Sequence, residues 1–494
     1  MGCEQCAGEN RRRWREGFAR DLDGSENGDH RKNVVNSQRG GRDQTMKANK
    51  AGKRKAGVRF SAAVACLVAI ASLGNASHAR AEPPTQTPNA ATSPVENPSD
   101  WMSQSGFFGD WGGERTTLSN DGFDFFGNFQ SQTSSITHGG KKRGTATTYQ
   151  AVVGTTLNLE KLMDIPGADF TLAVSDRFGS NASNLAGTKV IIDSNYGEGE
   201  NFRLANLSFR QSLLQGRLSY QIGYFPAAAE FDYSPILCSL LNQGFCGHPN
   251  SLAADSSGIQ NPPGAQMGAR VTGFILPDVY LKVGAFEVIP SDYANNAPGF
   301  DLGTGGSTGK IYLTELGWNA KLGSQGLVGH YKIGGYYDTS EAPDVVDPAI
   351  QRKGRTNGWL SVDQMVFSVG PDASRGLVLF ANLTEAGKAN EQIESYDSAG
   401  FVFLGPFASR PDDILSLGWA RSNLNTRVLE AERLKQPEFR YYLAEKYIDL
   451  SYRFQLTPWL FITPDIQYLM DPGVFSKAHY PNATAIGGEL AIRF

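Results

Sequence analysis

The last eleven residues of the sequence, TAIGGELAIRF (Thr484 to Phe494), alternate between two faces. Counted back from Phe494, every second residue as far as position 486 is apolar or glycine, whereas Glu489 and Arg493 lie on the opposite parity. A period of two residues predicts a β-strand with one apolar and one polar face. No later residue of this sequence covers the apolar face, so we expect the surroundings of the protein to cover it.

The same alternation recurs along most of the chain. In KYIDLSYRFQL (residues 446–456), apolar side chains at even positions oppose Asp449, Ser451 and Arg453 at odd ones. Applied throughout, the period of two predicts sixteen strands. They are expected near 121–132, 145–160, 168–179, 200–213, 216–227, 266–275, 279–289, 309–320, 327–340, 355–368, 375–386, 395–405, 413–424, 440–456, 460–471 and 483–494.

The connections between these strands alternate in length. Short turns such as MDIPG, LLQG and TPW alternate with long polar loops. The long loops are expected at about 180–199, 228–265, 290–308, 341–354 and 425–439. This pattern is typical of an all-β transmembrane antiparallel barrel with short periplasmic turns and long extracellular loops. Sixteen strands enclose a lumen too wide for side chains to fill, so the apolar face is predicted to point outward to lipid.

The first part of the chain predicts an export signal. A basic run ends at Lys55 and precedes an apolar core at 62–73, and Ala79-Arg80-Ala81 forms a small-x-small cleavage site. The core is too short for a spanning helix and has the length of a signal-peptide core. Residues 46–81 are therefore predicted to be a signal peptide that begins at Met46.

The rest of the domain organisation follows from this assignment. Residues 1–45 are charged and precede the signal, so we interpret them as a misassigned or non-native extension. Residues 82–100, rich in Pro, Thr and Asn, are predicted to be a flexible linker without a core. Residues 101–494 are predicted to form the barrel with a short segment before its first strand.

Charge and cysteine content restrict the partners. Residues 1–81 carry 16 of the 46 basic and 8 of the 50 acidic side chains, so the remainder has 30 basic and 42 acidic ones and a net charge of −12. This balance argues against a nucleic-acid partner. Outside the leader only Cys238 and Cys246 remain, and two close cysteines in an exported chain predict a disulfide. A metal site with His248 is the alternative, but it lacks a fourth ligand.

Motifs of catalysis are not found. GTGGSTGK (residues 303–310) imitates a phosphate-binding loop, but Ile311 follows the lysine where Ser or Thr should bind magnesium. We expect no enzyme activity, no metal and no cofactor, although a lipid hydrolase with a Ser/His pair on the barrel is left open.

Charged residues on the inward parity are the candidates for function. A water-filled pore tolerates them, and opposite charges across a constriction select polar solutes. Arginines and carboxylates can also hydrogen-bond pairs of sugar hydroxyls. Arg177 is the one most expected to line the pore. The full set is Arg177, Arg210, Arg217, Arg270, Glu315, Asp363, Asp449, Arg453, Asp465 and Glu489.

Three segments resemble the carbohydrate-selective porin family of the bacterial outer membrane. They are SGFFGDWGGERTTLSNDGFDFFGNF (residues 105–129), FPAAAEFDYSPILCSLLNQGFCGHP (225–249) and LTPWLFITPDIQYLMDPG (456–473). The second is similar to that family's disulfide-bearing loop. The resemblance spans nearly all of 101–494 and implies a sixteen-stranded barrel that passes glucose and related sugars by facilitated diffusion, with loops folded inward.

The function expected from all of this is a passive channel for small sugars in the outer membrane of a Gram-negative bacterium. Outer-membrane lipid, lipopolysaccharide and the barrel assembly machinery are the expected partners. Phe494 resembles the terminal assembly signal of such barrels, and homo-oligomerisation is left open. The alternatives are a general or ion-selective porin of the same fold, the hydrolase mentioned above, and a soluble two-domain β-protein, which would purify without detergent.

Overall fold

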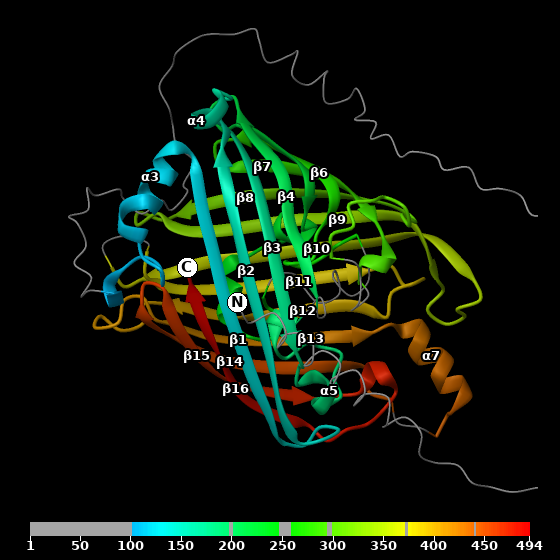
Figure 1. Ribbon diagram of the computed structural model, residues 1–494. Helices are drawn as coiled ribbons and strands as arrows, with labels where there is room; N and C mark the ends of the chain where they lie inside the picture. The colour runs from blue at the N-terminus through cyan, green and yellow to red at the C-terminus, as the bar shows by residue number, and fades with distance from the viewer. Residues whose placement is uncertain (1–100, 197–200, 247–257, 294–298, 371–373, 439–440) are drawn as a thin grey trace, which may run out of the picture. The chain divides into compact units, whose positions relative to one another are not determined.

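The computed structural model describes residues 101–494, apart from 197–200, 247–257, 294–298, 371–373 and 439–440 (Figure 1). Its sixteen strands form one closed antiparallel barrel in which neighbours in sequence are neighbours in the sheet. β1 (Phe123–His138) pairs with β16 (Ala483–Arg493) and closes the barrel. Closure leaves no free sheet edge. The predicted all-β barrel of sixteen strands is therefore confirmed.

The strands between the two at the seam follow the predicted segments closely. They are β2 (Gly144–Asn158), β3 (Ala168–Gly179), β4 (Phe202–Leu213), β5 (Leu218–Phe225), β6 (Gln266–Leu276), β7 (Val279–Val288), β8 (Gly309–Leu322), β9 (Leu327–Pro343), β10 (Gln351–Ser368), β11 (Gly376–Ala386), β12 (Ile393–Leu404), β13 (Ile414–Leu424), β14 (Ala444–Thr457) and β15 (Leu460–Met470).

One boundary differs by more than a few residues. β1 was predicted to end at residue 132 but continues to His138. Its outward positions there are hydroxyl residues, so the alternation of apolar and polar side chains fades. Hydrogen bonds hold it to β2 instead, with Thr133 Oγ1 3.0 Å from Thr147 Oγ1 and Ser135 Oγ 2.7 Å from Thr145 Oγ1. Cross-strand hydroxyl pairs thus extend the strand where hydrophobic patterning gives no signal.

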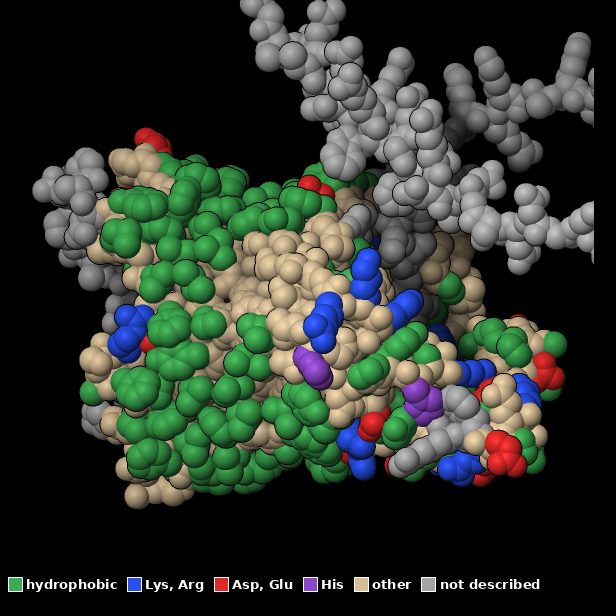
Figure 2. All heavy atoms as spheres, turned by 90° about the horizontal axis from the view of Figure 1, so that it is seen from below, with side chains coloured by type: hydrophobic (Ala, Val, Ile, Leu, Met, Phe, Trp, Pro, Cys, Tyr) green, Lys and Arg blue, Asp and Glu red, His purple; other side chains and the backbone are tan. Residues whose placement is uncertain are grey.

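The two faces of the wall have the predicted orientation. Leu450, Ile466 and Ile486 lie in one register row across β14, β15 and β16, and all three are exposed on the outside. On the opposite parity, Asp449 and Gln467 are paired and buried inside. Figure 2 shows hydrophobic side chains over much of the wall, whereas charged side chains gather mainly toward the end that carries α7 (Thr426–Lys435).

Helices are short and lie in the connections. Besides α7 they are α3 (Glu114–Asp121), α4 (Leu159–Met163) and α5 (Ser183–Ala186), together with the 3₁₀ turns η1 (Trp101–Ser103), η2 (Trp111–Gly113), η3 (Ser194–Tyr196), η4 (Ala227–Ala229), η5 (Pro235–Ser239), η6 (Pro290–Tyr293) and η7 (Val474–Ser476). Within the described ranges, no helix combines the length and the apolar character needed to span a bilayer.

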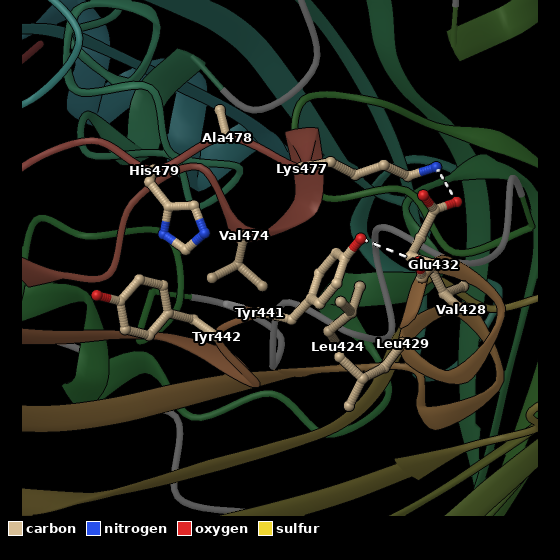
Figure 3. A pocket seen from close by; sticks show the side chains of 10 residues that line it. All are labelled: Leu424, Val428, Leu429, Glu432, Tyr441, Tyr442, Val474, Lys477, Ala478 and His479. Atoms are coloured by element: carbon tan, nitrogen blue, oxygen red, sulfur yellow. Dashed lines mark hydrogen bonds and ion pairs between the residues drawn. The ribbon is translucent and has the colours of Figure 1, made fainter. Parts of the chain in front are cut away.

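α7 belongs to a loop predicted only as polar. Asn425 caps the helix by accepting a hydrogen bond from the Arg427 N–H at 2.9 Å. Figure 3 shows the helix and η7 around a small pocket: Tyr441 donates to the Glu432 carbonyl at 3.0 Å, and Lys477 Nζ lies 2.7 Å from Glu432 Oε1. The pocket has room for about one water molecule, with a volume of about 20 Å³. The contacts fix the loop against the barrel rather than leaving a ligand site.

The seam is clasped by the segment before β1. The Phe107 N–H donates to the Arg493 carbonyl at 2.9 Å, and Arg115 Nη2 donates to the Phe494 carbonyl at 3.0 Å. The ring of Phe108 lies 5.1 Å from that of Phe494. Lipid alone was expected to cover the apolar face of the last strand. Ile486 is exposed on the outside of the barrel, whereas Phe494 is covered in part by the chain's own aromatic rings.

Candidate functional site

The connection between β5 and β6, described at 226–246 and 258–265, enters the barrel; we call these described residues the β5–β6 loop. Phe231 in the first part of the loop and Ile259 in its last part pack inside the wall. They join Phe286 and Trp359 in a buried cluster. Farther along, Leu240 and Phe245 pack in a second buried cluster. Because the loop carries this much apolar surface, packing it inside the lumen is more favourable than exposing it to water. It narrows the space that the sixteen strands enclose.

The loop is fixed at a first anchor by residues of β8, β9 and β10. The Asp232 N–H donates to Glu315 Oε2 at 2.7 Å, and Ser361 donates its hydroxyl to the Asp232 carboxylate. Ser234 Oγ donates to Asp363 Oδ2 at 3.2 Å. Burial raises the pKa of Asp232 to about 7, against the opposing effects of Lys332 and of the Ser361 hydroxyl. This anchor therefore mixes buried acids and bases.

Glu315 is the centre of the first anchor. Besides the Asp232 N–H it accepts Tyr280 OH at 2.9 Å and Trp359 Nε1 at 3.2 Å. Lys282 Nζ lies 3.6 Å from its Oε1 atom. One wall carboxylate thus accepts three hydrogen bonds and forms one ion pair.

A second anchor holds the loop to β12, β13, β14 and β15. The Asn242 N–H donates to Asp449 Oδ2 at 2.9 Å, and Asn242 Nδ2 donates to Gln467 Oε1 at 2.9 Å. Arg453 Nη2 donates to the Cys238 carbonyl at 2.8 Å. Cys238 is joined to Cys246 by a disulfide, as expected for this pair. The bridge closes the loop segment that carries the anchor.

The connection between β3 and β4, described at 180–196 and at residue 201, also folds inward. Asp193 Oδ1 accepts Ser134 Oγ at 2.6 Å, and Gln467 Nε2 donates to the Ile192 carbonyl at 3.1 Å. Burial raises the pKa of Asp193, too. The two inward loops meet where the Ser194 N–H donates to the Leu241 carbonyl at 2.9 Å. The two loops therefore contact each other inside the barrel.

The predicted acidic site residues lie on the inward parity but beneath these loops. Glu315 is 1% exposed, Asp449 0% and Glu489 4%. Asp363 and Asp465 are buried as well. We expected such residues to face the water of the pore; most of them hold loops instead. The parity of a strand residue follows from the sequence, but what covers it depends on contacts between distant segments.

The predicted arginines divide into three groups. Arg270 and Arg453 are held by the β5–β6 loop, Arg270 through an ion pair of 2.8 Å between its Nε and Glu230 Oε2. Arg217 lies in the turn after β4 instead of in a strand, which corrects its expected place. Arg177 and Arg210 lie on β3 and β4.

Arg177 belongs to a polar row on the inner wall. Gln130 of β1, Gln150 of β2 and Arg177 of β3 are direct register partners. Arg177 Nε donates to Gln150 Oε1 at 3.1 Å, and Gln150 Nε2 donates to Gln130 Oε1 at 3.2 Å. Arg210 is exposed, with a side chain 52% accessible, and its Nη2 lies 3.0 Å from Asp169 Oδ2. We call Gln130, Gln150 and Arg177 the amide row.

Sequence reasoning missed the basic residues of the first anchor. Lys282 donates to the Glu230 carbonyl, and Lys332 to the Tyr233 carbonyl. Both lie on the inward parity of their strands, so the rule that selected Glu315 could have found them. Among the residues described, no group of three or more His, Cys, Asp or Glu side chains is arranged to hold a metal.

Comparison with known proteins agrees with this geometry. Residues 142–494 match the family model described as "Carbohydrate-selective porin, OprB family". The chain is 33% identical over 441 residues to Porin B of Pseudomonas aeruginosa, covering 83% of this chain and 93% of that protein. It is 27% identical over 392 residues to the putative porin QuiX of Acinetobacter baylyi, covering 74% and 88% of the two chains.

Solved structures give the same result. The high-pH structure of Pseudomonas putida OprB aligns with a TM-score of 0.73 and 29% identity, covering 80% of this chain and 99% of that one. The low-pH structure of the same protein aligns with a TM-score of 0.54, 25% identity and the same coverage. The family model matches most of the chain, and one relative is more than 30% identical to it. The barrel narrowed by inward loops is consistent with both findings. The chain therefore belongs to the OprB family of carbohydrate-selective porins.

Proposed function

We propose that the protein lets small carbohydrates of the glucose class diffuse across the outer membrane without energy input, through the lumen that the β5–β6 loop narrows and along the wall that carries the amide row. The observation that supports this most directly is a loop held at two anchors inside the barrel, together with a wall whose half-buried Gln130 and Gln150 amides are fixed by the buried Arg177. Such groups donate and accept hydrogen bonds with hydroxyl pairs. Because no step needs a bound cofactor or a metal, we propose none.

Liposome swelling tests the selectivity. We expect the mature chain in liposomes to pass glucose faster than a neutral amide of equal size. Arg177→Gln should slow glucose severalfold because the half-buried Gln150 loses the buried guanidinium that holds its amide, whereas Arg352→Gln, at the long-loop end of β10, should not. Equal rates for glucose and the amide would favour a general porin. A reversal potential far from zero in a salt gradient would favour an ion-selective one.

The hydrolase alternative needs a serine beside a histidine. His330 Nδ1 lies 2.6 Å from Asp363 Oδ1, and Ser234 donates to the other oxygen of Asp363. The acid thus separates the two groups, so the histidine is not placed to take the serine proton. We propose on this ground that the channel is not an enzyme. Ester hydrolysis by the pure protein, abolished in Ser234→Ala, would contradict it.

The ends of the chain enter the proposal as well. We propose that residues 46–81 are removed as a signal peptide, which N-terminal sequencing of the protein from outer membranes would test; both 46–81 and 82–100 lie outside the described residues. Outer-membrane lipid, lipopolysaccharide and the barrel assembly machinery remain the proposed partners, and cross-linking in intact membranes would test for a homo-oligomer.

A further inference from the structure

A cavity of about 340 Å³ opens at the long-loop end of the barrel, and none of the anchor residues of the β5–β6 loop named above lines it. Four connections and the first residues of β14 line it, with Lys141 from the β1–β2 turn and Lys189 from the β3–β4 connection on its sides. Its volume lies at the lower end of the range for small-molecule sites. One six-carbon ligand is therefore the size that it suits.

The lining supplies the groups that recognise a polyol. Phe475 and Tyr480 contribute ring surface, and Asn184 contributes an exposed amide. Gln392 is held in place from both ends of its side chain: its Oε1 accepts Lys189 Nζ at 2.8 Å and its Nε2 donates to the Phe475 carbonyl at 3.0 Å. Ring faces suit the C–H side of a sugar, and amides suit its hydroxyls.

The lining also carries positive charge, which restricts the kind of ligand that the cavity suits. In the part of the chain that the structure describes, neither Lys141 nor Lys189 forms an ion pair. Glu445 is the acid at this site, but it is buried and already accepts the Thr188 hydroxyl at 2.6 Å, the Lys189 N–H at 3.0 Å and the Gly473 N–H at 3.0 Å. The cations of the lining are thus Lys141 and Lys189, and the Lys189 ammonium also donates to Gln392 Oε1 and lies 5.8 Å from the centroid of the Phe475 ring.

We propose that this cavity is a capture site for a sugar acid, a six-carbon polyol that carries a carboxylate. The proposal rests on the proposed function, because a site at the mouth serves a channel that passes carbohydrates. The carboxylate lies between Lys141 and Lys189, where charge-assisted hydrogen bonds are stronger than neutral ones. The hydroxyls contact Asn184 and Gln392.

Calorimetry on the full mature chain in detergent tests this with three probes: gluconate, glucose and acetate. At low salt we expect gluconate to bind at least tenfold more tightly than either of the others, and added salt to weaken it. Lys189→Gln should weaken gluconate about tenfold. The matched control is Lys353→Gln, at the long-loop end of β10, where the lysine is paired with Glu341 at 3.0 Å; it should change nothing.

Three outcomes would overturn the proposal: equal binding of glucose and gluconate, equal binding of acetate and gluconate, or unchanged gluconate binding in Lys189→Gln. Glucose permeation in liposomes is measured on the same variants and should not change in Lys189→Gln. If the wild-type protein passes no glucose, the proposed channel function fails, while the calorimetric comparison still decides whether the capture site exists.

Discussion

The two anchors of the β5–β6 loop both hold the loop to the barrel wall, but with different chemistry. The first buries Asp232 and Glu315 together with Lys282 and Lys332, so opposite charges compensate one another inside the barrel. The second relies on the Asn242 amide, on Asp449 and Arg453, each bonded to a neutral backbone group of the loop, and on a covalent bridge. Removing one member of a cluster of compensating charges leaves several buried charges without a partner. Removing one hydrogen bond to a neutral group leaves only one buried group unpaired. The first anchor should therefore be the more sensitive of the two.

The largest effect is expected from Glu315→Ala. It leaves the Asp232 N–H, Tyr280 OH and the Lys282 ammonium without their acceptor, which costs about 3–5 kcal/mol for a broken buried charge cluster. The loop should leave the wall, and single-channel conductance should rise severalfold. Glu315→Gln, which keeps an acceptor oxygen, should give a smaller rise. Wild-type conductance in Glu315→Ala would show that the first anchor does not hold the loop.

The next effect is a pH dependence that belongs to the first anchor. The pKa of Asp232 is about 7 in the docked loop, above the usual value of 3.8, so the docked state binds the proton more tightly than the released state. Docking is fully stabilised below about pH 4, weakens by at most about 1.4 kcal/mol per pH unit as the pH rises toward 7, and then stays constant. Gating events in planar bilayers should become more frequent between pH 4 and pH 7.

Asp232→Asn supplies the control for this dependence. The amide cannot ionise, so the frequency of gating events should no longer change between pH 4 and pH 7. A variant that keeps the wild-type pH profile would assign the dependence to another group.

Removal of the bridge should have a moderate effect on the second anchor. The disulfide closes a segment with a sequence separation of 8, and the chain-entropy model gives about 2–3 kcal/mol for a loop of that size. In Cys238→Ser/Cys246→Ser the barrel should still form, but the loop should be cleaved faster by a protease added to proteoliposomes. Protease resistance equal to that of the wild type would show that the other contacts of this anchor are sufficient.

The smallest effect among the anchor variants is expected from Asp449→Asn. The amide oxygen can still accept the Asn242 N–H, so only the charge assistance is lost, about 1 kcal/mol. Conductance should change by less than twofold. A change as large as that of Glu315→Ala would reverse the ranking of the two anchors.

Phe494 offers a test outside the lumen. It contacts Phe107 and Phe108 and its N–H donates to the Gly127 carbonyl at 2.9 Å. We expect its deletion to lower the amount of folded protein in the outer membrane severalfold, while the channels that do form conduct normally. Quantitative blotting of membranes measures the first quantity. A normal yield would remove its proposed role as an assembly signal.

The sequence predicts the barrel better than it predicts the lumen, for a physical reason. Strand parity is local, because alternate side chains of a strand point to opposite faces, and it correctly placed Glu315 and Asp449 inside. Their partners lie 83 and 207 residues away, in a loop whose path no local pattern encodes. The same parity rule places Lys282 and Lys332 inside as well, although they were not among the predicted site residues. Gln130 and Gln150 of the amide row were not predicted, because the candidates were chosen by charge and glutamine carries none.

The clasp at the seam also places a second attachment beside the β1–β16 ladder. Its contacts join Phe107 to Arg493 and Arg115 to Phe494, so the segment before β1 is bound to the residues at the end of β16. The ladder itself pairs Asn128 with Arg493. Bringing distant parts of a sequence together costs chain entropy, and the ladder already brings these two parts together. The clasp therefore adds contacts to the seam at little further cost in chain entropy.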